Sequence, residues 1–180
     1  WMIAQFPLKT LKFFAHRSLG FAVLIMLLLI PFGQDINGNT NWISIGPIDF
    51  QPSEVAKVLL ILWSAYTIES NFGDSNKING RLVFGFALVL LVVLKGGDLG
   101  SAVVIGLILA TLIYLSGAES KYLMALAVVG ILGVAGLVAM QPYRIARFTA
   151  FVHPFAEGVY KNAGWQPAHS LMALGSGGLF

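Results

Sequence analysis

The chain has 180 residues, of which 57% are hydrophobic and only 11% are charged, and its formal net charge is +3. Soluble domains carry roughly a quarter charged residues, so this composition, with a mean hydropathy of +0.81, excludes an ordinary soluble domain and indicates a membrane protein. The chain contains no cysteine, which excludes disulfides and thiolate metal sites. The positive charge does not indicate nucleic-acid binding, because no basic stripe interleaved with aromatic residues is present.

Five apolar runs are separated by Gly, Pro and polar turns, so we expect an all-α, polytopic transmembrane helix bundle. Several runs are shorter than the roughly 20 residues that cross about 30 Å of hydrocarbon, so their helices must borrow flanking residues or tilt. Because the chain begins at Trp1 rather than Met and ends within an apolar phrase, we expect it to be part of a longer protein. The expected spans are residues 15–32, 52–70, 81–95, 100–116 and 121–140, with a basic loop before them, a polar connector at 34–50, a polar loop at 69–81 and the start of a large extracytoplasmic loop at 141–180.

The Lys and Arg residues in alternate loops orient the expected bundle. Six of them fall on one side of the membrane and four on the other. The richer side is therefore expected to be cytoplasmic, which puts the start of the second span on the outer face. The six are Lys9, Lys12, Arg17, Lys77, Arg81 and Lys121, and the four are Lys95, Arg144, Arg147 and Lys161.

The second span opens with two ionisable residues, Glu54 and Lys57, which share one helix face because they are three residues apart. A Lys at mid-bilayer costs about 3 kcal/mol on insertion scales, so we expect the two side chains to form an ion pair. Pro52 and Ser53 suit the first turn of this helix, where a missing N–H is tolerated and a hydroxyl can accept a hydrogen bond.

Other ionisable residues are expected at the same outer level. Asp98 precedes the fourth span and is expected to cap it and to face the bundle interior, while Arg144 and Arg147 follow the fifth span. Together with Glu54 and Lys57 they favour a water-accessible cavity in the outer half of the bundle. A purely structural interpretation stays open, in which these residues are a helix-packing pair, a helix cap and two arginines that reach the lipid headgroups.

Two further residue types are given structural interpretations. Trp42, Trp63 and Trp165 are expected to be interfacial anchors. The three histidines lack the spacing of metal ligands, so we expect no metal site built on them.

The string from Trp42 to Lys57, Trp-Ile-x-Ile-Gly-x3-Phe-Gln-Pro-Ser-Glu-x-Ala-Lys, resembles the signature of the SEDS family of bacterial cell-wall synthesis, which includes FtsW, RodA and SpoVE. The phrases at 142–154 and 163–178 resemble two more family motifs. Gly97-Asp-Leu-Gly-Ser resembles the family phrase Pro-Asp-Leu-Gly-Thr, with Gly97 in place of proline, and Asn41 stands where the family commonly has arginine. The resemblance covers about the third to seventh of about ten family helices. Its motif positions here are Trp42, Gln51, Pro52, Ser53, Gln166 and Ser170.

The resemblance implies a peptidoglycan glycosyltransferase that polymerises lipid II, an undecaprenyl-diphosphate-linked disaccharide pentapeptide, on the outer face of the bacterial cytoplasmic membrane. It also implies a class B penicillin-binding protein and other division proteins as partners. Lys57, Arg144 and Arg147 would then be partners of the diphosphate, and Glu54, Lys57 and Asp98 would line the functional cavity. The essential aspartate of the family lies beyond Phe180, so this chain alone is expected to be inactive. The sequence identifies no cofactor and leaves a divalent cation open.

Two phrases, Arg147-Phe-Thr-Ala-Phe and Gln166-x3-Ser-Leu-Met-Ala-Leu, are more similar to the division subfamily than to the elongation subfamily. Three alternatives stay open: an elongation-type polymerase that acts in cell shape, a lipid II flippase, and a scaffold of the division machinery. A flippase would use the same residue types, since a charged cavity between helices also serves a translocation path.

Overall fold

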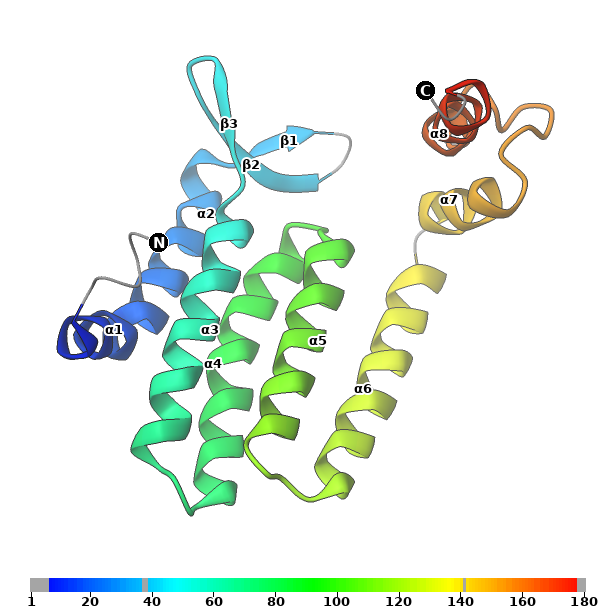
Figure 1. Cartoon of the computed structure of the whole chain (residues 1–180). Helices are drawn as coiled ribbons and strands as arrows, with labels where there is room; N and C mark the ends of the chain where they lie inside the picture. Colours follow the sequence, from blue (N-terminus) through cyan, green and yellow to red (C-terminus); the bar gives the residue numbers. More distant parts are fainter. Residues whose placement is uncertain (1–6, 37–38, 141, 178–180) are drawn as a thin grey trace. The chain divides into compact units, whose positions relative to one another are not determined.

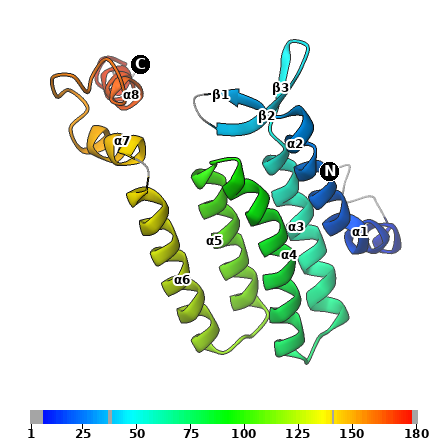
Figure 2. The ribbon, with the colours of Figure 1, turned by 180° about the vertical axis from the view of Figure 1, so that it is seen from behind.

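The computed structural model describes residues 7–36, 39–140 and 142–177, which form two compact units, Trp1–Gly130 and Ile131–Phe180. Within the first unit, helices lie side by side and a small sheet covers one end of them (Figures 1 and 2). The helices of this unit are α1 (Leu8–Leu27), α2 (Leu29–Phe32), α3 (Pro52–Ser70), α4 (Ser75–Lys95), α5 (Leu99–Leu115) and the first part of α6 (Ser120–Ala139).

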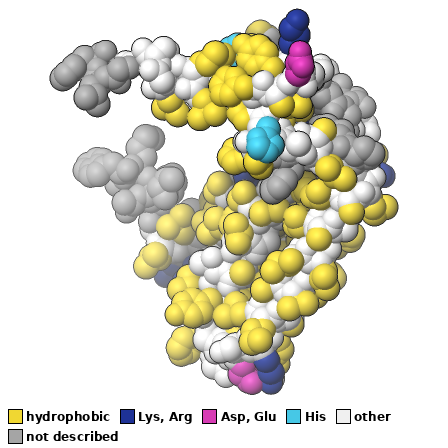
Figure 3. Space-filling view, turned by 90° about the vertical axis from the view of Figure 1, so that its right-hand side faces the viewer, with side chains coloured by type: hydrophobic (Ala, Val, Ile, Leu, Met, Phe, Trp, Pro, Cys, Tyr) yellow, Lys and Arg dark blue, Asp and Glu magenta, His cyan; other side chains and the backbone are white. Residues whose placement is uncertain are grey.

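Several of these helices have the length and composition of membrane spans, which confirms the expected polytopic helical class. Continuous helix over Leu8–Phe32, Ser75–Lys95 and Ser120–Ala139 is long and apolar enough to cross a membrane, and Leu99–Leu115 is a shorter apolar helix. Figure 3 shows hydrophobic side chains over most of the visible helical surface. No residue of α6 is buried within the described part of the chain. These surfaces suit a hydrocarbon environment or contact with further helices.

Helices α1 and α4 begin earlier than the apolar runs predicted, so the predicted loops are wrong over residues 8–14 and 75–81. At α4, the Asp74 side chain accepts a hydrogen bond from the backbone N–H of Lys77 at 3.0 Å and caps the helix. At α1, Lys9 and Lys12 are good helix formers that follow Pro7. The apolar pattern predicts only the apolar part of each helix, whereas a cap and polar helix formers extend the helix beyond it.

Residues 34–50, predicted as a plain polar connector, contain a three-stranded antiparallel sheet in the order β1-β2-β3. The strands are β1 (Gln34–Ile36), β2 (Asn39–Ile45) and β3 (Ile48–Phe50). Gly46, with φ of 64°, adopts the left-handed conformation that the β2–β3 turn requires. The backbone N–H of Thr40 in β2 donates to the carbonyl oxygen of Gly96, which attaches the sheet to the turn between α4 and α5. We call this end of the first unit, with the sheet and the starts of α3 and α5, the sheet end.

The core of the first unit lies between α1, α3, α4 and α5. Its largest fully buried side chains include Phe86, Met26 and Leu60. Trp63 was expected to be an interfacial anchor, but it packs against this core, and its ring lies directly over Gly85 of α4. A side chain at Gly85 would overlap that ring, so the glycine sets how closely α3 and α4 approach.

The second unit contains the end of α6, α7 (Pro142–Val152) and α8 (Trp165–Ser176). The predicted loop at 141–180 therefore contains two helices. The turns between them are tightly packed at Gly164, where a Cβ atom would lie 2.7 Å from the carbonyl oxygen of Pro154. This close approach excludes any larger residue without a shift of the backbone.

Candidate functional site

Asp98 caps α5 at the sheet end, as the sequence predicted. Its Oδ1 accepts a hydrogen bond from the backbone N–H of Ser101 at 2.9 Å. The turn that positions Asp98 at the start of α5 depends on Gly97, whose φ of 80° lies in the left-handed region that favours glycine. The glycine that departs from the family phrase is therefore compatible with a tight turn between α4 and α5.

The second oxygen of Asp98 binds two side chains from distant parts of the chain. Oδ2 accepts from Gln51 Nε2 at 2.8 Å and from Asn41 Nδ2 at 3.1 Å. Gln51 is the residue that precedes α3, and Asn41 lies in β2. The side chains of Ser53 and Ser101 lie 3.3 Å apart between α3 and α5. We call these five residues the Asp98 network, and it joins the sheet to the starts of two helices.

The pKa of the Asp98 carboxyl is lowered from its ordinary value of 3.8. Partial burial raises this pKa by opposing the charged form, but the hydrogen bonds from Ser101, Asn41 and Gln51 together outweigh that effect. All of these donors are neutral, so Asp98 keeps its full negative charge at neutral pH. The sheet end therefore carries an ionised carboxylate that, among the described residues, is stabilised by neutral hydrogen-bond donors.

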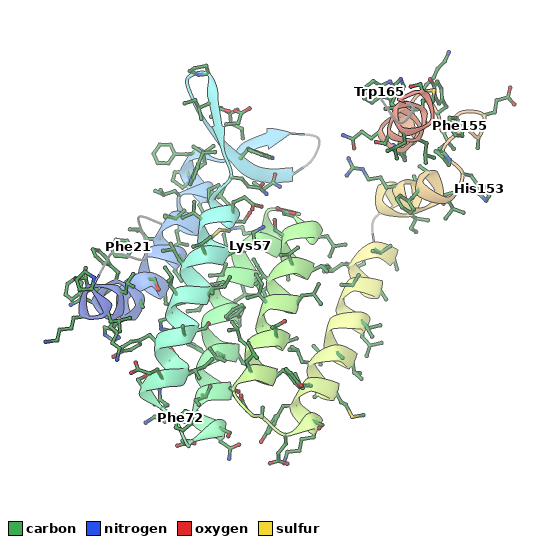
Figure 4. All side chains as sticks on the ribbon, in the orientation of Figure 1. Phe21, Lys57, Phe72, His153, Phe155 and Trp165 are labelled. Atoms are coloured by element: carbon green, nitrogen blue, oxygen red, sulfur yellow. The ribbon has the colours of Figure 1, made fainter. Side chains whose placement is uncertain are left out.

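The predicted ion pair between Glu54 and Lys57 is confirmed. Lys57 Nζ lies 2.7 Å from Glu54 Oε1. The Lys57 side chain is only 16% exposed and that of Glu54 is 57% exposed, so the cation is the buried member of the pair. Figure 4 shows Lys57 in the first turns of α3, near the sheet. A partly buried ammonium at this position is stabilised by an anion, and a bound anionic ligand can compete with Glu54 for it.

The other motif residues of the first unit also lie at the sheet end. Pro52 and Ser53 are buried in the first turn of α3, and Trp42 of β2 is half-buried and pairs with Gln34 of β1. The opposite end holds a different polar set, with an ion pair between Lys12 and Glu69. The structure therefore brings Glu54, Lys57 and Asp98 to one end of the unit, as the sequence predicted.

The predicted residues of the terminal segment lie in the second unit. Arg147 is exposed on α7, Gln166 and Ser170 are exposed on α8, and the Arg144 side chain lies outside the described residues. Trp165 is 53% exposed. The convergence of the two arginines with Lys57 stays a prediction.

A pocket of about 150 Å³ opens at the sheet end. Glu54, Lys57 and Asp98 do not line it, so the expected cavity among these three residues stays a prediction. No group of three or more His, Asp or Glu residues able to hold a metal ion occurs in the described ranges. The lining residues of the pocket are Leu29, Ile30, Thr40, Val92, Lys95 and Gly96.

Asn41 and Ser101 are partners of Asp98 that the sequence analysis missed. Ser101 follows Asp98 by three residues, which is the spacing between a helix-capping side chain and the backbone N–H that it binds. The sequence could therefore have predicted this hydrogen bond. The sequence gives no such indication for Asn41, because its contact with Asp98 depends on how β2 meets the α4–α5 turn. Its Oδ1 atom is buried and has no partner within the described structure.

The comparisons with known proteins cover the whole chain. The FtsW/RodA/SpoVE family, described as "Cell cycle protein", matches residues 1–180. The chain belongs to this family, also called SEDS. A relative from Aeromonas salmonicida, named "Probable peptidoglycan glycosyltransferase FtsW", is 30% identical over 100% of this chain and 46% of its own length. A relative of the same name from Legionella pneumophila is 34% identical over 90% of this chain and 42% of its own length. The chain thus spans about half the length of these SEDS relatives.

Solved structures support the SEDS fold. Rod shape determining protein RodA from Thermus thermophilus (D255A mutant) has a TM-score of 0.57 at 23% identity, over 83% of this chain and 59% of that one. A chain from a structure titled "Structural coordination of polymerization and crosslinking by a peptidoglycan synthase complex" has a TM-score of 0.67 at 26% identity, over 99% of this chain and 53% of that one. The chain thus has the multi-pass helical fold of SEDS membrane proteins, and its FtsW relatives carry a glycosyltransferase name.

Proposed function

We propose that the full-length protein containing this chain is a peptidoglycan glycosyltransferase that polymerises lipid II during cell division. The observation that carries the proposal is the partly buried Lys57 ammonium, paired with Glu54 at the sheet end that also holds the ionised Asp98. The names of the FtsW relatives support the activity and favour the division subfamily over elongation. The protein then works in the cytoplasmic membrane with a class B penicillin-binding protein.

The reaction requires groups for a departing diphosphate and for an attacking hydroxyl. A sugar hydroxyl of one chain attacks the anomeric carbon of another, the bond from that carbon to the diphosphate oxygen breaks, and the hydroxyl proton passes to a base. A cation near the diphosphate stabilises the negative charge that develops on it. Lys57 suits this role, and in the proposal Arg144 and Arg147 add guanidinium groups that can bind phosphate oxygens in pairs. The base is assigned to no residue of this chain.

Glu54 and Asp98 have distinct parts in this proposal. Glu54 holds the Lys57 ammonium in place before substrate binds. Because the Glu54 side chain is exposed, a diphosphate can replace it as the partner of Lys57. Asp98 fixes the starts of α3 and α5 through Gln51 and Ser101, so it acts as a positioning residue for Lys57. In this proposal α1 continued by α2 forms one span of the bilayer, and α3, α4, α5 and α6 form the others. The sheet end lies on the outer face, since Lys and Arg are more numerous on the opposite side.

The deciding experiment follows labelled lipid II with the full-length protein. In detergent we expect formation of glycan polymer, and in sealed vesicles we expect no transbilayer movement of lipid II that is independent of polymerisation. Transport without polymer formation would replace the proposal by a flippase. Neither polymer formation nor transport, in a protein that still supports division, would replace it by a scaffold.

The two arginines are tested by binding. We expect Arg144→Ala combined with Arg147→Ala to weaken lipid II binding and to make the remaining binding less dependent on salt, because two charge-assisted contacts are lost. Unchanged affinity and salt dependence would assign both arginines to lipid headgroups instead.

A further inference from the structure

Four rings form a stacked row in the second unit, which contains none of the residues of the Asp98 network. The ring centroids of Phe155 and Tyr160 lie 6.4 Å apart with an interplanar angle of 22°, and those of Tyr160 and His169 lie 5.7 Å apart at 17°. Trp165 stacks on His169 at 4.2 Å and 29°. We call these four residues the aromatic row. It joins the start of α8 to the turns that precede it.

The local structure fixes the rings of the aromatic row. Trp165 and His169 lie one turn apart on α8, and His169 Nδ1 is 2.8 Å from the Trp165 carbonyl oxygen, so this nitrogen donates to it. The preceding turns are held by Gly158, with φ of 78°, and by the Asn162 side chain, which donates to the Gly158 carbonyl oxygen at 3.1 Å. These contacts restrict the ring faces to one arrangement, which reduces the entropy cost of binding.

The aromatic row is not an ordinary hydrophobic core, because its two ends are exposed within the described part of the chain. Phe155 is 57% exposed and Trp165 is 53% exposed. An open hollow of about 540 Å³ lies against Phe155 and Tyr160. Figure 4 shows Phe155 and Trp165 beside α8. Aromatic faces that are rigid and exposed beside a hollow are typical of binding surfaces.

The lining of the hollow indicates the chemistry of its ligand. Besides the two rings it contains Glu157, Lys161 and Met172. A carboxylate and an ammonium offer an acceptor and donors for hydroxyl groups, and an aromatic face packs against the C–H face of a pyranose ring. A lipid tail needs an apolar lining throughout, and a phosphate would be repelled by Glu157. The combination of rings with both charge signs favours a sugar.

We propose that the aromatic row and its hollow bind a pyranose ring of a glycan. The inference rests on the proposed function for the identity of this glycan, which is the sugar portion of lipid II or of the strand made from it. The row takes no part in the chemical step. It holds a sugar through Phe155 and Tyr160, with Glu157 and Lys161 on the hydroxyl groups.

The test measures binding of a fluorescent, lipid-free peptidoglycan tetrasaccharide to the full-length protein in detergent, by anisotropy. We expect Phe155→Ala and Lys161→Ala each to weaken binding about fivefold to tenfold, since each removes one stacking or hydrogen-bonding partner. The matched control is Phe151→Ala, which removes a ring that is 77% exposed and outside the aromatic row, and which should change binding less than about twofold. Thermal unfolding verifies that each variant is folded.

The outcomes separate this site from the proposed function. Unchanged tetrasaccharide binding in folded Phe155→Ala and Lys161→Ala would overturn the site, and loss of co-purified phosphatidylglycerol from these variants would identify a lipid as the occupant. Lys57→Ala, measured in parallel, should lose polymerisation of lipid II but keep tetrasaccharide binding. If the unmodified protein makes no polymer and Phe155→Ala still weakens tetrasaccharide binding, the proposed function fails and the sugar site stands.

Discussion

Asp98 accepts hydrogen bonds from the side-chain amides of Asn41 and Gln51 and from the backbone N–H of Ser101, and these donors are neutral. An arrangement of this kind keeps a carboxylate ionised at the edge of an apolar bundle without the partial neutralisation that a cation would supply. The stabilisation that Asp98 provides requires both of its carboxylate oxygens to accept hydrogen bonds at the same time. A substitution that keeps the shape of the side chain but removes one acceptor should therefore lower the stability of the protein.

Asp98→Asn should destabilise the protein by about 1–3 kcal/mol, because the single amide oxygen cannot accept from Ser101 on one side and from Gln51 and Asn41 on the other. Thermal unfolding in detergent measures the effect. Asp74→Asn is the matched control, since Asp74 caps α4 through one exposed bond and asparagine is an equally good cap. An equal change in the two variants would mean that the side-chain bonds of Asp98 contribute nothing.

The lowered pKa of Asp98 predicts a pH dependence of stability. A carboxyl with a folded-state pKa below its ordinary 3.8 binds fewer protons folded than unfolded, so its stabilising contribution is complete above that value and is lost as pH falls through the folded-state pKa. The gap in unfolding midpoint between the unmodified protein and Asp98→Asn should therefore be constant down to about pH 5 and narrow below it. A gap that stays constant to about pH 2 would contradict the assignment.

At the scale of elements, glycines decide how closely the segments of the first unit approach. Gly85 places α4 beneath the ring of Trp63 on α3, and Gly96 lies against the Thr40 carbonyl oxygen of β2, where a Cβ atom would be 3.0 Å away. Gly106 on α5 instead faces open space within the described structure. Glycines that cannot be told apart in the sequence thus have different structural roles.

Gly85→Ala should lower stability by about 1–3 kcal/mol, because the added methyl group overlaps the Trp63 ring and forces one helix to shift. Trp63→Phe in the same chain should recover part of the loss, which a double-mutant cycle would show. Gly106→Ala is the control and should be neutral or stabilising, since its methyl group meets no atom. Equal effects at the two glycines would refute close packing at Gly85.

The elements show how far local sequence patterns extend. The apolar runs predicted the positions of α1 and α3 to α6, and the spacing of Glu54 and Lys57 predicted their ion pair. The sheet was missed because its strands are short and mix polar with apolar residues, and because its attachment to Gly96 depends on a contact between distant segments. Helices α7 and α8 were missed because they are short and because Arg, His and Pro interrupt their apolar residues. Likewise, local patterns predicted the cap of Asp98 but not its bond to Asn41.

At the scale of the whole molecule, the first unit has charged and polar groups at both ends and an apolar middle. The pair of Lys57 and Glu54 differs from the surface pairs because its cation is largely buried. In the ion pair between Lys121 and Glu119, both side chains are exposed. The two lysines therefore allow stability and function to be separated.

Lys57→Ala should lower both stability, by about 1–2 kcal/mol, and polymerase activity, since Glu54 loses its cation and the diphosphate loses its partner. Adding Glu54→Gln should restore stability and leave activity low. Lys121→Ala should change neither property measurably. Full polymerase activity in a stable Lys57→Ala protein would refute the role of Lys57 in substrate binding.

The Asp98 network also bears on how the protein is made. Its side-chain bonds join residues 57 and 47 positions apart, from Asn41 and from Gln51 to Asp98. A ribosome releases Asn41 and Gln51 well before Asp98, so both amides stay hydrated while α3 and α4 enter the bilayer. The sheet end then closes only when the first turn of α5 arrives. During biosynthesis, this end of the first unit is therefore among the last parts to acquire its native contacts, and an insertion intermediate that stops after α4 has β2 unattached to α5.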